Sequence, residues 1–283
     1  MKGSGKVYLV GAGPGDPGLL TLKARDLIAE ADCVIYDYLV NPEILRHARR
    51  DAQLIDVGKR GTEVSWTQTE INRLLVAKAA QYDRVVRLKG GDPFIFGRGA
   101  EEAEALIAAG IEWEVVPGVT AGSSVAAYAG IPITHRGISS SVAFVTGHED
   151  PSKRQPAVRW EKLATGVDTL VFFMGVGRLS EIAAQLMWHG RPADTPVAVI
   201  RWGTYQHQET VVSDLANIAA AVEQRHLKSP AIIVVGEVVR LRERLQWFRE
   251  LRSAECGLRI SLSDSARLAS YGVPNPFFEA LAS

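Results

Sequence analysis

Short apolar runs alternate with helix-forming segments through the first 136 residues, and this alternation constrains the fold more than any other feature. Five runs have the length of buried strands, and amphipathic segments separate them at the spacing of βαβ units. We therefore predict a mostly parallel sheet with helices packed on its faces. The runs are centred on residues 7–10, 33–36, 53–57, 85–88 and 112–116.

Glycine and polar residues gather where these predicted strands end. In open α/β sheets, ligands bind beyond the carboxyl ends of the strands. A ligand site is therefore expected where the clusters meet. They are residues 11–16, Asp37, residues 59–60, residues 90–98 and residues 118–122.

The stretch from Arg87 to Glu104, RLKGGDPFIFGRGAEEAE, is the densest of these clusters. Gly90 and Gly91 permit a sharp backbone turn and leave room for a ligand against it. The aromatic side chains that follow are costly to expose, so we expect them to line a site. Arg98 stands between two glycines and is therefore held close to backbone on both sides.

The first glycine turn, GAGPGDPG at residues 11–18, invites comparison with nucleotide-binding turns. The dinucleotide fingerprint GxGxxG requires a glycine where Asp16 stands. Pro14 also removes an amide that a phosphate-binding loop would use. No GKS or GKT sequence occurs, which excludes a P-loop. The turn makes room for a ligand without features of a pyrophosphate site.

A second α/β unit is predicted after the segment RGISSS at residues 136–141. Its β-rich runs again end on glycine in several cases, and one alternating segment favours a hairpin. The runs cover residues 142–145, 169–173, 197–200, 208–213 and 232–235, and an amphipathic helix is expected over residues 240–252. We predict an N-terminal α/β domain over residues 1–136, a C-terminal α/β domain of mixed sheet over residues 137–250, and a tail of unknown role over residues 251–283.

Composition narrows the class of protein. Hydrophobic residues make up 47% of the chain, and 32 basic residues balance 32 acidic ones. A net-neutral chain has no global field for nucleic acid, so an anionic ligand must be held by a local cluster. We find no apolar run long enough to span a membrane and no signal peptide. Only Cys33 and Cys256 occur, without metal-ligand spacing, and His148 is interpreted as a loop residue, so we expect a cytoplasmic protein without a metal site.

The motifs resemble, in unbroken order over residues 7–248, those of the uroporphyrinogen-III C-methyltransferases, which belong to the tetrapyrrole methylases. The stretches VGKRG, RLKGGDPFIFGRG and ITHRG are the most specific to this activity, whereas GAGPGD and the terminal VVG are shared across the superfamily. The remaining matches are VIYDYLV, VPGVTAG, VTGHE, FFMGVG, RWGT and SPAIIVVGEVV.

The resemblance implies an enzyme with two α/β domains and an S-adenosylmethionine site in the cleft between them. It implies methylation of uroporphyrinogen III at ring carbons 2 and 7, giving precorrin-2 by way of precorrin-1 and releasing S-adenosylhomocysteine, for sirohaem or cobalamin synthesis. It further implies a homodimer. Only six residues precede the first predicted strand, so we expect a stand-alone methyltransferase rather than a bifunctional one.

Site residues follow from the same resemblance. Catalytic roles fall to Asp37 as general base, Lys59 as proton donor or charge stabiliser, and Arg98. Arg60, His135 and Arg136 are expected to bind the substrate's carboxylates. The cofactor pocket is expected to comprise Pro14, Gly90, Gly91, Asp92, Ile95, Thr120, Ala121, Met174, Gly203 and Ala231.

Other functions stay open at this point. The nearest is a related tetrapyrrole methylase that acts on a later corrin intermediate. A nicotinamide-dependent oxidoreductase is disfavoured by Asp16, and an RNA-modifying methylase by the zero net charge and the lack of a basic stripe. A non-catalytic scaffold would leave the polar strand ends unexplained.

Overall fold

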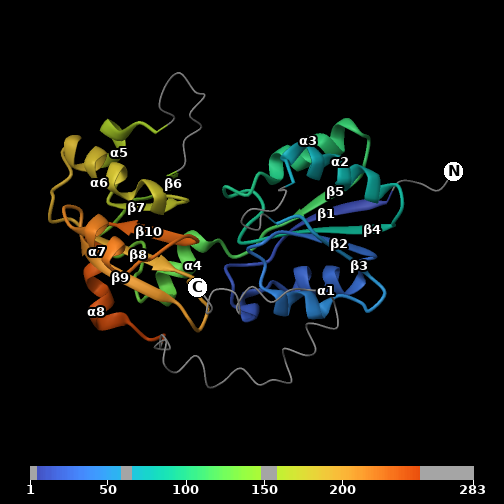
Figure 1. Cartoon of the computed structure of the whole chain (residues 1–283), viewed down its shortest axis with the longest axis horizontal. Helices are drawn as coiled ribbons and strands as arrows, with labels where there is room; N and C mark the ends of the chain where they lie inside the picture. Colours follow the sequence, from blue (N-terminus) through green and yellow to red (C-terminus); the bar gives the residue numbers. More distant parts are fainter. Residues whose placement is uncertain (1–4, 59–65, 148–157, 249–283) are drawn as a thin grey trace.

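The computed structural model describes residues 5–58, 66–147 and 158–248, which form two five-stranded sheets with helices on their faces (Figure 1). Lys59, Arg60, His148 and the tail over residues 251–283 lie outside the described residues. The predicted fold class, two α/β units, is confirmed.

The first sheet is entirely parallel and has the strand order β3-β2-β4-β1-β5. Its strands match the five apolar runs of the sequence. Because β4 is the central strand, its residues after Arg84 are buried between both helical layers. The strands are β1 (Lys6–Gly11), β2 (Cys33–Tyr36), β3 (Gln53–Asp56), β4 (Arg84–Lys89) and β5 (Trp113–Val116).

Helices cover both faces of this sheet (Figure 1). On one face lie α1 (Leu22–Glu30), capped by Thr21, and the 3-10 helix η2 (Pro42–His47); their apolar residues pack against Val10, Val34 and Leu88. On the other face lie α2 (Gln68–Ala79) and α3 (Gly99–Ala108). A short 3-10 helix, η1 (Pro17–Leu19), follows the first glycine turn.

The second sheet is mixed, with the order β6-β7-β10-β8-β9. Strands β6 and β7 are parallel, β10 is antiparallel to both of its neighbours, and β8 pairs with β9 as the expected hairpin. The strands are β6 (Val142–Thr146), β7 (Thr169–Phe173), β8 (Pro196–Arg201), β9 (Glu209–Asp214) and β10 (Ala231–Val235).

One face of the second sheet is covered by three helices and the other by α4 (Ala121–Tyr128), although α4 directly follows β5 of the first sheet. Gly122 permits this packing, because a Cβ there would lie 2.8 Å from the Phe173 ring and 2.9 Å from the Phe144 ring. The chain therefore crosses from one sheet to the other before α4. The three helices are α5 (Trp160–Gly166), α6 (Leu179–Trp188) and α7 (Ile218–Gln224); η3 (Val176–Arg178) precedes α6.

The helix predicted over residues 240–252 is only partly confirmed, because helical backbone ends at Leu245 within the described residues. The 3-10 helix η4 (Glu237–Leu241) leads into α8 (Arg242–Leu245), and Gln246 has extended backbone. The Trp247 Nε1 then donates to the Ala127 carbonyl, and the Trp247 and Phe248 rings both contact the Tyr128 ring. The packing of Trp247 and Phe248 against α4 therefore outweighs the helical pattern of the local sequence. Similarly, residues 42–50 form the shorter helix η2.

The described residues include no helix long and apolar enough to cross a membrane.

Candidate active site

The turns after β1, β4 and β5 meet at the carboxyl edge of the first sheet, backbone against backbone. Gly13 and Gly91 exchange two hydrogen bonds, with N···O distances of 3.2 and 2.7 Å. A Cβ at Gly118 would lie 2.2 Å from the Gly91 carbonyl oxygen and 2.7 Å from the Gly11 Cα. Glycine is therefore required sterically where these three turns touch.

Asp92 fixes the loop that follows this contact. Its Oδ1 accepts hydrogen bonds from the Phe94 and Ile95 amides at 2.8 and 3.1 Å, and its Oδ2 accepts from the Gly118 amide at 3.1 Å. The carboxylate thus ties the loop after β4 to the turn after β5. Both of its oxygens bond to backbone, so its first role is to shape the predicted cofactor pocket.

Asp37 lies directly after β2 and is partly exposed. Its Oδ1 lies 3.3 Å from the Leu39 and Gly90 amides, and its Oδ2 lies 3.5 Å from Arg87 Nη2. The carboxylate is therefore oriented from two sides, and its side chain remains 27% exposed. This arrangement suits a group that exchanges a proton with a ligand.

Arg98 has its side chain in the space between the two sheets. It forms a two-point contact with Glu101, in which Nε donates to Oε1 at 2.8 Å and Nη2 to Oε2 at 2.7 Å. This contact lowers the pKa of Glu101. Arg98 lines a cavity of about 370 Å³ with Phe94 and Phe96 from the first unit and Thr146 and Met174 from the second. The Phe96 and Phe173 ring centroids are 5.0 Å apart, so the two units touch beside this cavity.

Left-handed backbone is concentrated in the loops where the two units face each other. Among the described residues, six non-glycine residues have positive φ, and five of them follow strands β4, β7 and β8. Such conformations cost about 1–3 kcal/mol each and persist where the surroundings require them, often at functional sites. The five are Phe96 (φ 52°), Arg98 (φ 59°), Met174 (φ 55°), Trp202 (φ 47°) and Thr204 (φ 72°).

A second contact between the units lies at the first glycine turn. The Tyr128 hydroxyl donates to Asp16 Oδ2 at 2.6 Å, and the Asp16 amide donates to the Thr204 hydroxyl at 3.0 Å. A Cβ at Gly15 would lie 2.1 Å from the Tyr205 ring, so only glycine fits there. Asp16, which departs from the dinucleotide fingerprint, is used to join the two units.

The other predicted cofactor residues all lie near these edges. Pro14 is in the first glycine turn, and the Thr120 hydroxyl caps α4, which begins at Ala121. Gly203 packs against the Val125 side chain of α4, and Ala231 begins β10 beside Arg201.

Of the predicted substrate-binding residues, His135 and Arg136 lie in the exposed turn between α4 and β6. Lys59 and Arg60 lie outside the described residues, so their predicted roles stay predictions.

Five residues of this region received no role from sequence reasoning. Arg87, Lys89 and Glu102 are buried together behind Asp37, while Glu101 pairs with Arg98 and Tyr128 with Asp16. The sequence contains a signal for a role of Arg87 and Lys89. Positions 87 and 89 place two cations on one face of an otherwise apolar strand. The acidic partners lie on a helix whose facing could not be fixed from spacing.

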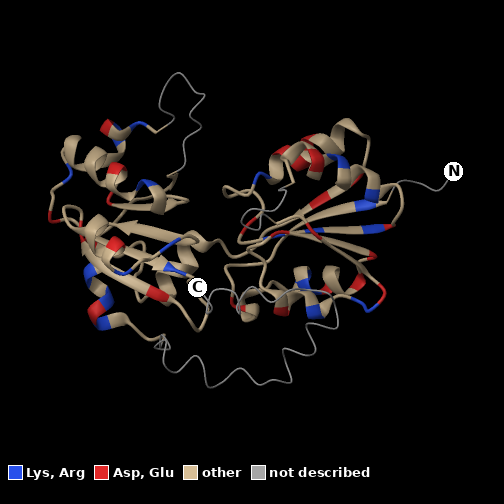
Figure 2. Cartoon of the chain, viewed as in Figure 1, with Lys and Arg blue, Asp and Glu red and all other residues tan. Residues whose placement is uncertain are grey.

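Charge is otherwise dispersed. Lys and Arg alternate with Asp and Glu over both units rather than forming a stripe (Figure 2). Within residues 5–58, 66–147 and 158–248, no three His, Cys, Asp or Glu residues are grouped so as to hold a metal ion.

Comparisons with known proteins give the following similarities. The sequence model of the family described as Tetrapyrrole (Corrin/Porphyrin) Methylases matches residues 6–219. A Methanosarcina barkeri protein named S-adenosyl-L-methionine-dependent uroporphyrinogen III methyltransferase is 55% identical over 239 residues, covering 84% of this chain and 94% of that protein. A siroheme synthase of Azotobacter vinelandii is 54% identical over 255 residues, covering 90% of this chain but 54% of that protein. The solved structure of uroporphyrin-III C-methyl transferase from Thermus thermophilus, complexed with S-adenyl homocysteine, superposes with a TM-score of 0.71 at 40% identity and covers 84% of this chain and 94% of that one.

Proposed function

The chain belongs to the tetrapyrrole (corrin/porphyrin) methylases, and we propose that it methylates uroporphyrinogen III at ring carbons 2 and 7, giving precorrin-2 by way of precorrin-1. The observation that carries this proposal is the similarity to relatives named for uroporphyrinogen III along nearly their whole length. The product is a precursor of sirohaem and cobalamin. A related methylase for a later corrin intermediate is not favoured by these relatives.

The residues at the strand ends fit S-adenosylmethionine. When bound, this cofactor supplies an electrophilic methyl group on a sulfonium. A Cβ at Gly91 would meet no described atom nearer than the Ala121 amide nitrogen, at 3.8 Å, so the turn leaves open space beside the start of α4. Backbone amides at a helix start suit a carboxylate. The cofactor residues proposed are those predicted from the sequence, with Asp92 shaping the loop that carries Ile95.

Local cations supply the attraction that a net-neutral chain lacks. Arg98 lines the cavity between the units, where a carboxylate substituent of the tetrapyrrole would replace or share its contact with Glu101. Lys59, Arg60, His135 and Arg136 are proposed to bind other carboxylates. Methyl transfer to carbon needs above all in-line placement of the nucleophile, and several cations around the substrate's rim provide it.

Asp37 is proposed to take the proton that the ring system loses after carbon methylation. Its Oδ1 is engaged by two amides, which leaves Oδ2 beside the Arg87 guanidinium and free of backbone contacts among the described residues. Lys59 is proposed as proton donor or charge stabiliser. General acid–base catalysis of this kind contributes about 10²–10⁴-fold.

The quaternary structure and location are further parts of the proposal. We infer a cytoplasmic homodimer, supported by the family resemblance, with domains over residues 1–136 and 137–250 and a tail over 251–283. Light scattering of the purified protein at micromolar concentration tests the dimer. A mass near 30.7 kDa, that of one chain, would contradict it.

The decisive assay is anaerobic incubation of the protein with S-adenosylmethionine and enzymatically generated uroporphyrinogen III. We expect the tetrapyrrole to gain the mass of two methyl groups and the absorbance of precorrin-2. Binding of S-adenosylhomocysteine without methylation of this substrate would favour the later corrin intermediate. Failure to bind the cofactor product at all would contradict the methyltransferase function itself.

A further inference from the structure

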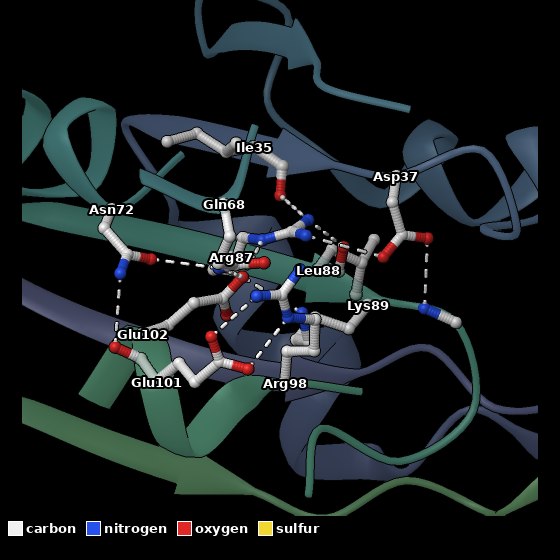
Figure 3. Close-up of polar contacts among 11 residues, drawn as sticks. Ile35, Asp37, Gln68, Asn72, Arg87, Leu88, Lys89, Arg98, Glu101 and Glu102 are labelled. Carbon is white, nitrogen blue, oxygen red and sulfur yellow. Dashed lines mark hydrogen bonds and ion pairs between the residues drawn. The ribbon is translucent and has the colours of Figure 1, made fainter. Parts of the chain in front are cut away.

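Three ionisable side chains are buried beneath the proposed catalytic edge, and we call them the buried charge group: Arg87, Lys89 and Glu102 (Figure 3). Arg87 and Lys89 lie on the same face of the central strand β4, and Glu102 reaches them from α3. All three are at most 5% exposed, and Glu102 is fully buried. The group is enclosed by the sheet and its helical layer.

A single oxygen of Glu102 holds the group together. Its Oε1 lies 3.1 Å from Arg87 Nε, 3.0 Å from Lys89 Nζ and 3.3 Å from Gln68 Nε2. Its Oε2 is buried and has no hydrogen-bond partner among the described residues. Burial and the charge of Arg87 lower the pKa of Lys89, while Glu102 opposes this shift. Glu102 is therefore the shared counterion of two crowded cations.

Stability does not account for such a group. Desolvating several charges costs several kcal/mol per ion, and well-packed apolar residues of similar volume are often neutral or stabilising in their place. The surrounding positions of β4, Val85, Val86 and Leu88, are apolar and fully buried. A charged group at the centre of this sheet therefore points to a role beyond folding.

A series of contacts links the buried Glu102 through Arg87 to Asp37, the proposed general base. The Arg87 guanidinium is held by Glu102 at Nε and by the Leu88 and Ile35 carbonyls at Nη1, at 3.0 and 3.4 Å. Its remaining nitrogen, Nη2, lies 3.5 Å from Asp37 Oδ2. The exposed fraction of the side chain rises along this series, from 0% at Glu102 to 3% at Arg87 and 27% at Asp37. Arg87 thus presents a fixed cation to the one carboxylate oxygen that the backbone does not hold.

We propose that Arg87, held by Glu102, is a positioning residue that orients the Asp37 carboxylate for proton transfer during methylation. The proposal rests on the function proposed above, because it assigns Asp37 a task in that reaction. Arg87 itself is too deeply buried to touch a substrate. It acts only through Asp37, and Glu102 acts only through Arg87.

The test is a double-mutant cycle on single-turnover methylation of uroporphyrinogen III, using Arg87→Met, Asp37→Asn and the double variant of the full chain. We expect Arg87→Met to lower the rate roughly 10- to 100-fold, since a misplaced group can cost about 10²-fold. Binding of S-adenosylhomocysteine and the KM for the tetrapyrrole should stay within about twofold. In the Asp37→Asn background, Arg87→Met should change the rate less than about twofold, because the Asp37 carboxylate through which Arg87 acts has been removed.

Lys89→Met is the matched control. It removes an equally buried cation from the same face of β4 with the same partner, Glu102, but leaves the Arg87–Asp37 contact in place. We expect its rate to stay within about twofold of the parent protein. If Arg87→Met does not fold, Arg87→Lys replaces it in the cycle. Arg87 contacts Glu102 and Asp37 through two different nitrogens, and a lysine has only one, so the same coupled loss is expected.

The outcomes separate the proposal from its premise. Independent, multiplying effects of the Arg87 and Asp37 substitutions would overturn the positioning role, as would equal losses in the Arg87 and Lys89 variants. Full activity of Asp37→Asn would overturn it through its premise while the methylation of uroporphyrinogen III stands. Absence of methylation by the parent protein would overturn the proposed function first.

Discussion

At the scale of single residues, the two aspartates of the site differ in how many carboxylate oxygens bond to backbone amides. Asp92 gives both carboxylate oxygens to backbone amides, whereas Asp37 keeps Oδ2 at the edge of the sheet beside Arg87. Two aspartates at neighbouring strand ends therefore differ in task. Asp92 shapes a loop, and Asp37 is the aspartate proposed to take the proton.

Replacing Asp37 with alanine separates these tasks. We expect Asp37→Ala to keep its affinity for S-adenosylhomocysteine within about twofold and to lose about 10²–10⁴-fold in turnover, the contribution of a general base. Calorimetric titration and the anaerobic assay measure the two quantities. Unchanged turnover would remove Asp37 from the mechanism.

Cys33 provides a pH prediction away from the site. It is fully buried in β2, and burial raises the pKa of its thiol from 9.0 to about 11. The native protein therefore keeps this proton between pH 9 and 11, while the unfolded chain loses it. Stability is full below pH 9 and falls as pH rises to 11.

The expected loss for Cys33 is at most about 3 kcal/mol, because each tenfold change in a proton-binding constant corresponds to about 1.4 kcal/mol. The measurement is urea unfolding of the parent protein and of Cys33→Ala at pH 8 and pH 10.5. The difference in unfolding free energy between the two proteins should shrink at the higher pH. A difference that is constant with pH would contradict the burial effect.

At the scale of elements, the strands could be predicted from the sequence far more completely than the contacts between turns. In the first sheet, the runs of β1, β2 and β4 became strands because burial on both sides of a parallel sheet demands continuous apolar residues. The tight meeting of Gly11, Gly91 and Gly118 was not predictable, because it joins three turns distant in sequence. Likewise, Trp247 ended the predicted C-terminal helix through a contact with Ala127, which no local pattern reveals.

Gly118 tests this contact between turns. A Cβ there would overlap the Gly91 carbonyl and the Gly11 Cα, neither of which can yield without moving a strand end. We expect Gly118→Ala to destabilise the protein by roughly 3 kcal/mol and to weaken binding of S-adenosylhomocysteine at least tenfold. Gly166→Ala is the control, since no described atom outside its immediate surroundings lies within 4 Å of the added Cβ. Equal stability of the two variants would contradict the contact.

The candidate site was predicted in outline for a related reason. Strand-end residues such as Asp37 and Gly90 could be placed because parallel topology fixes where strands end. Arg87 and Glu102 could not be paired from sequence, because their meeting depends on how α3 packs on β4. Backbone periodicity specifies which face of a strand a residue occupies, but not which helix residue opposes it.

At the scale of the whole molecule, the described residues of the two units touch at several points, and the cavity lies beside one of them. The Tyr128–Asp16 hydrogen bond is one of these contacts, and the Phe96–Phe173 ring contact borders the cavity. Because α4 follows β5 yet packs on the second sheet, the turn before α4 is shared by both units. Ligand binding and the relative placement of the units should therefore be linked.

Tyr128→Phe measures this linkage. It keeps the ring contacts with Trp247 and Phe248 but removes the 2.6 Å hydrogen bond to Asp16. We expect a loss of about 1.5–3 kcal/mol, the range for a hydrogen bond to a charged acceptor, and weaker binding of S-adenosylhomocysteine. Tyr82→Phe removes an exposed hydrogen bond to Gln53 and should change stability by less than about 0.5 kcal/mol. Equal stability of both variants would show that the contact does not join the units.

The central claim is that this cleft directs two methyl groups to uroporphyrinogen III, and labelling of the product tests it most directly. We would supply S-adenosylmethionine carrying a ¹³C methyl group without oxygen and record the ¹³C spectrum of the isolated tetrapyrrole. Two enriched methyl signals, assigned to ring carbons 2 and 7, are the predicted result. An unlabelled tetrapyrrole, or label at other carbons, would contradict it.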